Sequence, residues 1–279
     1  MNWFRRWRRA RILKHHLIPV GAFDAAVARL PILHGLDTAE RARLREAASL
    51  FIHDKTFSAA GGADVDDAIP LLIALQACLL TLNLDENSYR GWSEIILYPD
   101  EFMRQREEMD EAGVVHRMRD VLAGESWHGG PLVLSIASVE ESGAADGVNV
   151  VLHEFAHKLD MLNGDANGFP PLHRGMDAAS WAADFSAAYA DLCARVDAGE
   201  DTAIDPYAAT DPAEFFAVLT EVFFETPQLL NSEYPAIYRQ LQQFYRQHPL
   251  AFMPPRGTTG GPTQTGIAAT PGLDCFLRA

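Results

Sequence analysis

Residues 150–157 read Val-Val-Leu-His-Glu-Phe-Ala-His, an H-E-x-x-H pattern within an apolar run. Residues four positions apart on an α-helix lie on the same face, so a helix here presents His153 and His157 to one metal ion. Zinc binds imidazole nitrogen at about 2.0–2.1 Å, and a catalytic zinc site uses three protein ligands and a water. Glu154 projects beside the pair and can take a proton from that water. The pattern therefore predicts a helix that carries one zinc ion per chain.

The residues around the motif favour a buried helix. Apolar residues recur at helical spacing over residues 150–162, Asp146-Gly147 is expected at the start of the helix, and Asn163-Gly164 at its end. The alternative interpretation is a core helix with two ordinarily hydrogen-bonded histidines, because a chain with ten histidines can contain the pattern by chance. We favour the metal site.

Charge and cysteine content limit the class of protein. The net charge is −15, but residues 1–14 carry six basic residues and no acidic one, which leaves −21 for the remainder. Such an acidic body argues against direct binding of nucleic acid. The three cysteines are widely spaced and odd in number, which indicates a reducing compartment, and we expect the cytoplasm. No apolar run reaches the roughly 18–20 residues of a transmembrane segment.

Composition divides the chain into three parts. Residues 1–16 form a basic arm, for which we expect a solvated, frayed terminus; Trp3, Phe4 and Trp7 among its arginines leave a membrane-surface helix as the alternative. Residues 17–253 are expected to form one domain. Residues 254–279 are rich in glycine, threonine and proline and are predicted to be a disordered tail.

The periodicity of the chain predicts an α+β fold that is mainly helical, with a small mixed sheet over the motif helix. The last two predicted strands are joined by a glycine-rich loop and are expected to form a hairpin. An edge strand of this sheet could hold an extended peptide through main-chain hydrogen bonds. Helices are predicted over 22–33, 38–52, 64–82, 177–198, 212–225 and 234–248, strands over 94–99, 114–122 and 131–136, and loops over 57–63 and 124–130.

Two histidines need a third protein ligand. Asp160 lies on the same helical face as His157, but a carboxylate so close on one helix more often supports a site than coordinates the metal. The helix over 212–225 offers Glu214, Glu221 and Glu225, any of which would complete a His-His-Glu site. Spacing alone does not choose among these glutamates.

The chain resembles a known family, the Mlc titration factor A group of bacterial zinc metallopeptidases. The resemblance covers roughly residues 20–250. It rests on Ile96-Leu97-Tyr98-Pro99, Gly124-Glu125-Ser126-Trp127, the run from Asp146 to Asp160, Ile204-Asp205-Pro206-Tyr207-Ala208-Ala209, and Asp211-Pro212-Ala213-Glu214-Phe215-Phe216-Ala217-Val218.

The resemblance implies a zincin-like fold related to lethal-factor-like zincins. It puts the third zinc ligand on Glu214, a tyrosine that assists catalysis on Tyr207, and a further histidine that can reach the metal on His116. Lys158 departs from the pattern, because zincins usually place an uncharged residue there.

Two functions are expected. The first is a zinc-dependent peptidase, aminopeptidase-like and acting on small peptides or chain ends, in which Glu154 is the general base and Tyr207 donates a hydrogen bond to the developing oxyanion. The alternative, implied by the resemblance, is a regulatory binding protein that sequesters an Mlc-like transcriptional repressor of glucose uptake, with hydrolysis secondary. The expected partners are therefore a peptide substrate and a repressor protein.

Overall fold

The computed structural model describes residues 3–84, 88–100, 102–109, 115–122, 124–126 and 129–251. The helices are α1 (Trp3–His16), α2 (Val20–Arg29), α3 (Thr38–Asp54), α4 (Ala68–Leu80), α5 (Ile136–Glu141), α6 (Val150–Asp160), α7 (Ala178–Asp197), α8 (Pro212–Glu225), α9 (Pro227–Glu233) and α10 (Pro235–Tyr245). The strands are β1 (Thr56–Ala59), β2 (Glu94–Tyr98), β3 (Phe102–Met109), β4 (Val115–Leu122), β5 (Gly124–Ser126) and β6 (Leu132–Ser135). Short 3-10 turns are η1 (Pro31–Leu33), η2 (Met161–Asn163), η3 (Pro206–Ala209) and η4 (Pro249–Ala251).

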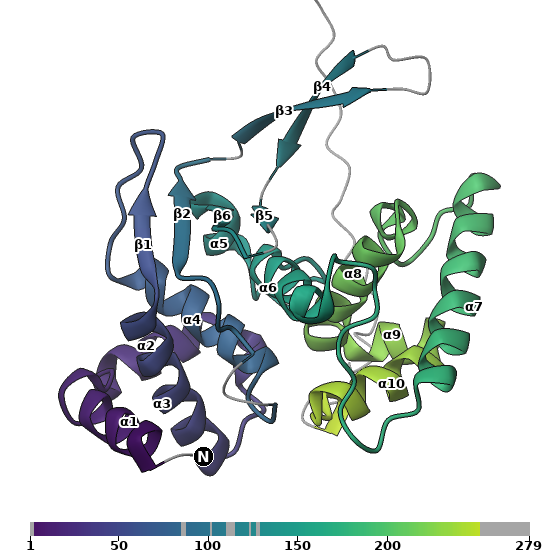
Figure 1. The fold of residues 1–279 in the computed structure, drawn as a ribbon. Coiled ribbons are helices and arrows are strands. Elements are labelled where there is room, and N and C mark those ends of the chain that lie inside the picture. The colour runs from purple at the N-terminus through teal and green to yellow at the C-terminus, as the bar shows by residue number, and fades with distance from the viewer. Residues whose placement is uncertain are drawn as a thin grey trace, which may run out of the picture.

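The helices form two groups with α6 and α8 between them. Helices α1–α4 lie on one side and α7, α9 and α10 on the other (Figure 1). Helix α4 is apolar all round, which is the pattern of a core helix, and it packs between α3 and α6. The mainly helical α+β fold predicted from the sequence is confirmed.

A four-stranded sheet lies beside α6. Its order is β1-β2-β6-β5, in which β1, β2 and β6 are parallel and β5 runs antiparallel to β6. The sheet is therefore mixed, as predicted, and among the described strands β5 pairs with β6 alone. This arrangement makes β5 the edge strand nearest to α6.

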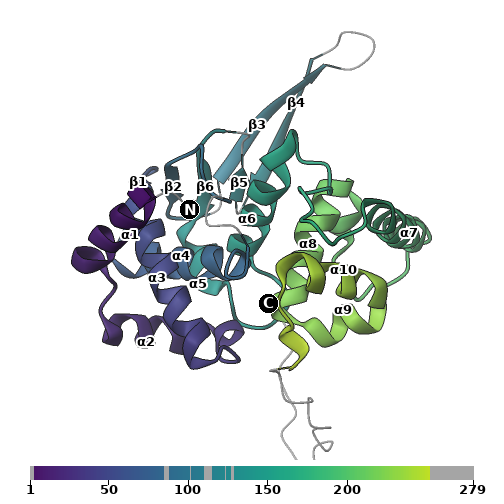
Figure 2. The same cartoon turned by 60° about the horizontal axis from the view of Figure 1, so that its bottom comes forward.

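The predicted strand pairing was wrong. Strand β4 pairs with β3, and together they form a two-stranded hairpin that projects away from the body of the protein (Figures 1 and 2). Strand β6 instead pairs with β5, which lies in the predicted loop 124–130. Strand β1 begins at Thr56 and overlaps the start of the predicted loop 57–63. Strands β1 and β5 have only four and three residues, which is too short for alternating polarity to identify a strand in the sequence. Whether such short segments form strands depends on the neighbouring strands with which they pair.

Helix α6 begins later than predicted. Its N-cap is Asn149, whose side chain accepts a hydrogen bond from the N–H of Leu152, whereas the Asp146 carboxylate accepts from the N–H of Val148 in the preceding turn. The Asn149 amide also donates to the side chains of Gln76 and Glu225, at 2.7 and 2.6 Å. One buried asparagine thus joins α4, α6 and α8.

Three helices of the C-terminal half begin with proline at their first position. These are Pro212, Pro227 and Pro235, where the missing N–H would have no partner within the helix. Helix α10 corresponds to the helix predicted over 234–248, whereas α9, which precedes it, was not predicted. Helix α10 ends at Arg246, which adopts a left-handed conformation with φ 53°.

The N-terminal arm is not frayed, in contrast to our expectation. Residues from Trp3 form α1, which packs against α3 through the buried side chain of Ile12. Arg8 pairs with Asp54 at 2.6 Å and Arg9 with Glu46 at 2.7 Å. Burial of one apolar side chain together with two ion pairs holds the helix, although each exposed pair contributes little by itself. The predicted tail 254–279 lies outside the described residues. Among the residues that the structure describes, no helix combines the length and apolarity needed to cross a bilayer.

The buried network at Asn149 makes stability depend on pH. Burial raises the pKa of Glu225 to about 7 from its ordinary value of 4.5, so the folded state favours the protonated carboxyl. This group stabilises the fold fully below pH 4.5, and its contribution, up to about 3 kcal/mol, is lost as the pH rises through 7.

Glu225→Gln keeps an acceptor for Asn149 and removes the ionisation. We expect the variant to gain stability relative to the wild type between pH 5.5 and pH 8, measured by denaturant unfolding at both values. The exposed Glu141→Gln serves as the control. A stability difference that is the same at the two pH values would contradict the prediction.

Candidate metal centre

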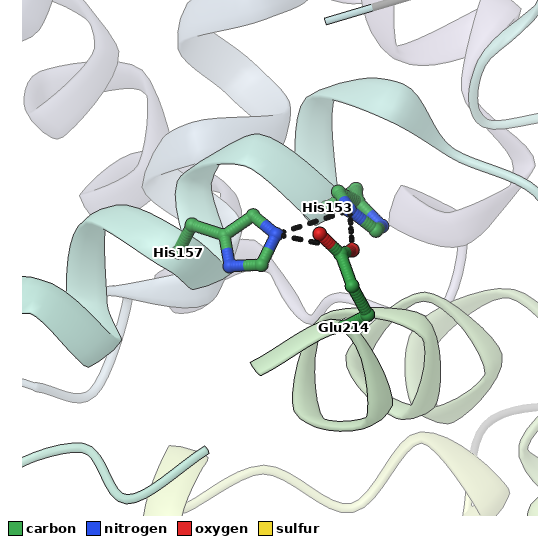
Figure 3. Close-up of side chains that lie close together, drawn as sticks. All are labelled: His153, His157 and Glu214. Atoms are coloured by element: carbon green, nitrogen blue, oxygen red, sulfur yellow. Dashed lines mark hydrogen bonds and ion pairs between the residues drawn. The ribbon is translucent and has the colours of Figure 1, made fainter. Parts of the chain in front are cut away.

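Helices α6 and α8 supply the side chains of the site. His153 and His157 lie one turn apart on α6, and Glu214 lies in the first turn of α8 (Figure 3). The start of α8 is fixed by its N-cap Asp211, whose carboxylate accepts hydrogen bonds from the N–H groups of Ala213 and Glu214. The three side chains point toward one another across the contact between the helices.

The ligand atoms converge on one point. His153 Nε2 lies 2.9 Å from Glu214 Oε2 and 3.2 Å from His157 Nε2, and His157 Nε2 lies 3.4 Å from Glu214 Oε2. Three donors held tetrahedrally at about 2.0–2.1 Å from one ion are about 3.3 Å apart, so this triangle fits a metal of that size. Among the described residues these three side chains form the His/Cys/Asp/Glu group able to hold an ion. The residues present therefore fit a metal.

Glu221 supports the cluster rather than completing it. Its Oε1 lies 2.7 Å from Nδ1 of His153, the ring nitrogen that faces away from Glu214. A carboxylate on the second nitrogen fixes the tautomer and orientation of a ligating histidine. Glu221 and Glu225 follow Glu214 by seven and eleven positions, so each lies within about 20° of Glu214 around α8. This shared face indicates that a second glutamate of α8 lies beside the cluster, but it does not indicate which glutamate binds the metal.

The electrostatics of the cluster favour a cation. Burial alone would lower the pKa of His153, but the charge of Glu221 and hydrogen bonds to Glu214 and Glu221 raise it well above 6.5. Burial would likewise raise the pKa of Glu214, but hydrogen bonds from His153 and His157 lower it well below its usual range. The carboxylates thus stabilise positive charge at the point where the three donors meet.

Glu154 is buried beside the cluster, under strand β5. A Cβ atom placed on Gly124 would lie 2.6 Å from Cγ and 2.7 Å from Oε1 of Glu154, closer than real Cβ atoms approach. Only glycine therefore fits at this position of β5 with Glu154 where it is. Gly124 belongs to the Gly-Glu-Ser-Trp segment on which the resemblance rests, but its approach to a residue 30 positions away has no local sequence signal.

Tyr207 lies at the open side of the cluster. It belongs to η3, where Asp205 accepts a hydrogen bond from the Tyr207 N–H, and its ring centroid lies 6.2 Å from that of His153. Its side chain is about half exposed, at 48%. Burial and the charge of Glu214 raise the pKa of Tyr207, so the hydroxyl remains a donor.

Asp160 and Lys158, the two other charged residues at the end of α6, make contacts that stabilise the fold. Asp160 accepts hydrogen bonds from the N–H groups of Asn167 and Gly168, both at 2.7 Å, and so holds the loop after the helix. Lys158 is buried, donates to the carbonyl of Gly130 at 3.0 Å and lies 4.8 Å from the ring centre of Trp92. Burial lowers its pKa to about 8, although the charge of Glu154 opposes the shift. The hydrogen bond to Gly130 and the contact with Trp92 explain how the charged side chain of Lys158 is accommodated at a position where zincins usually have an uncharged residue.

His116 is the second residue of β4, and its backbone pairs with Glu108 of β3. Its side chain lies outside what the structure describes, so its approach to the metal stays a prediction.

A helix that presents two histidines one turn apart, a glutamate from a second helix and a carboxylate after the first histidine is the arrangement of H-E-x-x-H metallopeptidases. A family model described as glucose-regulated metallo-peptidase M90 matches residues 4–246. The chain belongs to this family. The match begins inside α1, so the basic arm is part of the region that the family model covers.

The relatives agree with this assignment. Mlc titration factor A of Escherichia fergusonii is 41% identical over 223 residues, which are 79% of this chain and 84% of the relative. The Mlc titration factors A of Salmonella arizonae and Salmonella gallinarum are 42% and 43% identical over 232 residues, which are 81% of this chain and 91% and 86% of the relatives. The resemblance to the Mlc titration factor A family is confirmed.

The geometry separates the roles of the two glutamates nearest to His153. We expect Glu214→Ala to lose the metal, because only two of the three ligands, the imidazoles, remain to hold it. We expect Glu221→Gln to bind the metal about 10–100-fold more weakly. Elemental analysis of the purified protein and titration with a competing chelator measure both effects and identify the metal. The exposed Glu140→Gln is the matched control. Metal loss in Glu221→Gln with retention in Glu214→Ala would reverse the assignment.

Proposed function

We propose that this protein is a zinc-dependent peptidase with Glu154 as its general base. The observation that carries the proposal is the convergence of His153, His157 and Glu214 on one point beside a buried carboxylate. Two imidazoles and a carboxylate are a donor set that suits zinc, and three protein ligands leave a position open.

When bound, the ion would polarise the scissile carbonyl and lower the pKa of a water at the open position. Glu154 takes the proton from that water and passes it to the leaving amine. Lys158, one turn further along α6, lies close enough to Glu154 for the two charges to interact. Strand β5 lies close over Glu154 at Gly124, where a Cβ atom would not fit, and so limits the positions open to the carboxylate.

Tyr207 is proposed to stabilise the oxyanion. Its hydroxyl remains protonated, it borders the cluster, and its partly exposed position lets it face a substrate. The fixed turn of η3 around Asp205 holds the backbone from which it extends.

Strand β5 is proposed to bind the substrate. It is the edge of the sheet, and its Gly124 lies against Glu154, so a peptide added to that edge would run past the catalytic carboxylate. The carboxylates of Glu154, Glu214 and Glu221 attract a positively charged chain end. Small peptides or chain ends, cleaved in an aminopeptidase-like manner, are therefore the proposed substrates, and the cytoplasm is the proposed compartment.

A second function is proposed beside hydrolysis. The relatives are named Mlc titration factor A, which suggests binding of an Mlc-like repressor by this chain. Such binding would involve protein surfaces rather than DNA, since the body of the chain is strongly acidic.

The role of His116 also remains a proposal. Strand β4 begins at the distal end of the hairpin and returns to the sheet at Leu122, so coordination by His116 requires the hairpin to turn back over α6.

Glu154→Gln separates the two functions. The variant keeps the size of the side chain and removes the base, so it should retain the metal and lose at least about 100-fold in peptide turnover. Binding to the repressor, measured by calorimetry, should be unchanged. If wild type and variant are equally inactive on a panel of short peptides while both bind the repressor, hydrolysis is not the function.

Gly124→Ala tests the contact over Glu154. The added methyl group forces Glu154 out of position, so we expect kcat to fall at least about tenfold while metal content stays the same. Gly21→Ala is the matched control, because a Cβ atom there meets no other atom within 4 Å. Full activity of Gly124→Ala would show that the carboxylate does not need to be held there.

A further inference from the structure

The exposed face of α1 carries three large aromatic side chains. Trp3, Phe4 and Trp7 are 78%, 64% and 48% exposed, and the rings of Phe4 and Trp7 lie 6.1 Å apart. In the N-terminal half of the described chain, the other large apolar side chains that are exposed are aliphatic. Exposed aromatic clusters on a surface helix mark an interaction site rather than part of a core.

This face points away from the protein. At 100° per residue, Trp3, Phe4 and Trp7 lie on one side of α1, and Ile12, which packs against α3, lies on the other. Ion pairs of Arg8 and Arg9 with residues of α3 fix the helix in this rotation. Docking on α3 therefore displays the aromatic face outward.

Positive charge accompanies the aromatic face. Arg6, Arg11 and Lys14 are exposed, and the guanidinium of Arg11 lies 5.5 Å from the ring centre of Trp7. Arg11 and Lys14 lie on the same side of the helix as Trp7, one and two turns further along. Residues 1–14 carry six basic residues and no acidic one, in a chain of net charge −15.

An open groove runs beside this face. Its volume is about 520 Å³, and it lies where the aromatic face meets the side of α1 that packs on α3. It is lined by Phe4, Trp7, Arg8, Arg11, Ile12, His15 and His16 of α1 and by His53 of α3. Aromatic and cationic groups around a hollow of this size suit an anionic headgroup with its attached acyl region.

We propose that α1 binds the surface of a bilayer that contains anionic lipids, with Trp3, Phe4 and Trp7 at the headgroup level. The aromatic side chains supply the apolar contact, and the arginines and Lys14 supply attraction to the negative surface. Neither contribution alone gives firm attachment, and α1 combines both.

The charge distribution favours a membrane over other partners. A nucleic acid that extends past α1 would be repelled by the rest of the chain, whose net charge is −21. A planar bilayer can contact the basic helix alone, because α1 lies at one edge of the molecule. Both views place α1 at the outer edge of the N-terminal group of helices, while α6 and α8 lie between the two groups (Figures 1 and 2). Attachment through α1 thus leaves the metal centre uncovered.

The test is co-sedimentation of the full chain with vesicles, which needs no peptide substrate. We expect binding to vesicles of phosphatidylcholine with one third phosphatidylglycerol, and weakening as salt rises. Trp3→Ala/Trp7→Ala should lower the bound fraction at least about tenfold, and Arg6→Gln/Arg11→Gln should do so most strongly at low salt. Thermal unfolding equal to that of the wild type shows that each variant is folded.

Matched controls use exposed residues outside α1. Val148→Ala, which truncates an exposed apolar side chain, and Arg90→Gln/Arg239→Gln should bind like the wild type. Equal binding to pure phosphatidylcholine, no binding to either vesicle, or equal losses in the control variants would overturn the proposal. So would tighter binding to duplex DNA at the same salt, or a dimer that Trp3→Ala/Trp7→Ala dissociates without any effect on vesicles.

Discussion

The contact between α6 and α8 is the interaction on which the rest of the structure depends. It brings His153 and His157 of one helix against Glu214 and Glu221 of the other, with donor atoms 2.7–3.4 Å apart. Burying two carboxylates would be costly if they were unpaired, and here the imidazoles of His153 and His157 pair with them. The charges that make the site also define how the two helices pack.

The same contact extends into the core. Asn149 caps α6 and donates to Gln76 of α4 and Glu225 of α8, so the helix that carries the histidines is tied at its start to two others. On the opposite side of α6, Phe155 packs against Phe51 and Trp92, with ring centres 5.6 and 5.9 Å apart. A helix held from both sides fixes the positions of its two histidines, which is the preorganisation that a metal site requires.

The two proposed functional surfaces lie in different parts of the molecule. The acidic side chains of the candidate metal centre lie on α6 and α8, between the two groups of helices, whereas α1 at the edge carries six basic residues and no acidic one. Opposite charges kept apart in this way do not neutralise each other, so each surface can attract a ligand of its own charge preference.

The sequence by itself determined the motif helix and the ligand pair, because i, i+4 spacing puts His153 and His157 on one face whatever surrounds them. It also determined most long helices, since their apolar periodicity and proline starts are local signals. Helical spacing did not choose between Glu214 and Glu221, which share a face of α8, although the resemblance pointed to Glu214. The tertiary structure places Glu214 against Nε2 of His153, the nitrogen that faces His157, and Glu221 against Nδ1. The pairing of β3 with β4 and of β5 with β6, the packing of α1, and the contact of Gly124 with Glu154 likewise depend on neighbours distant in sequence, which no local pattern encodes.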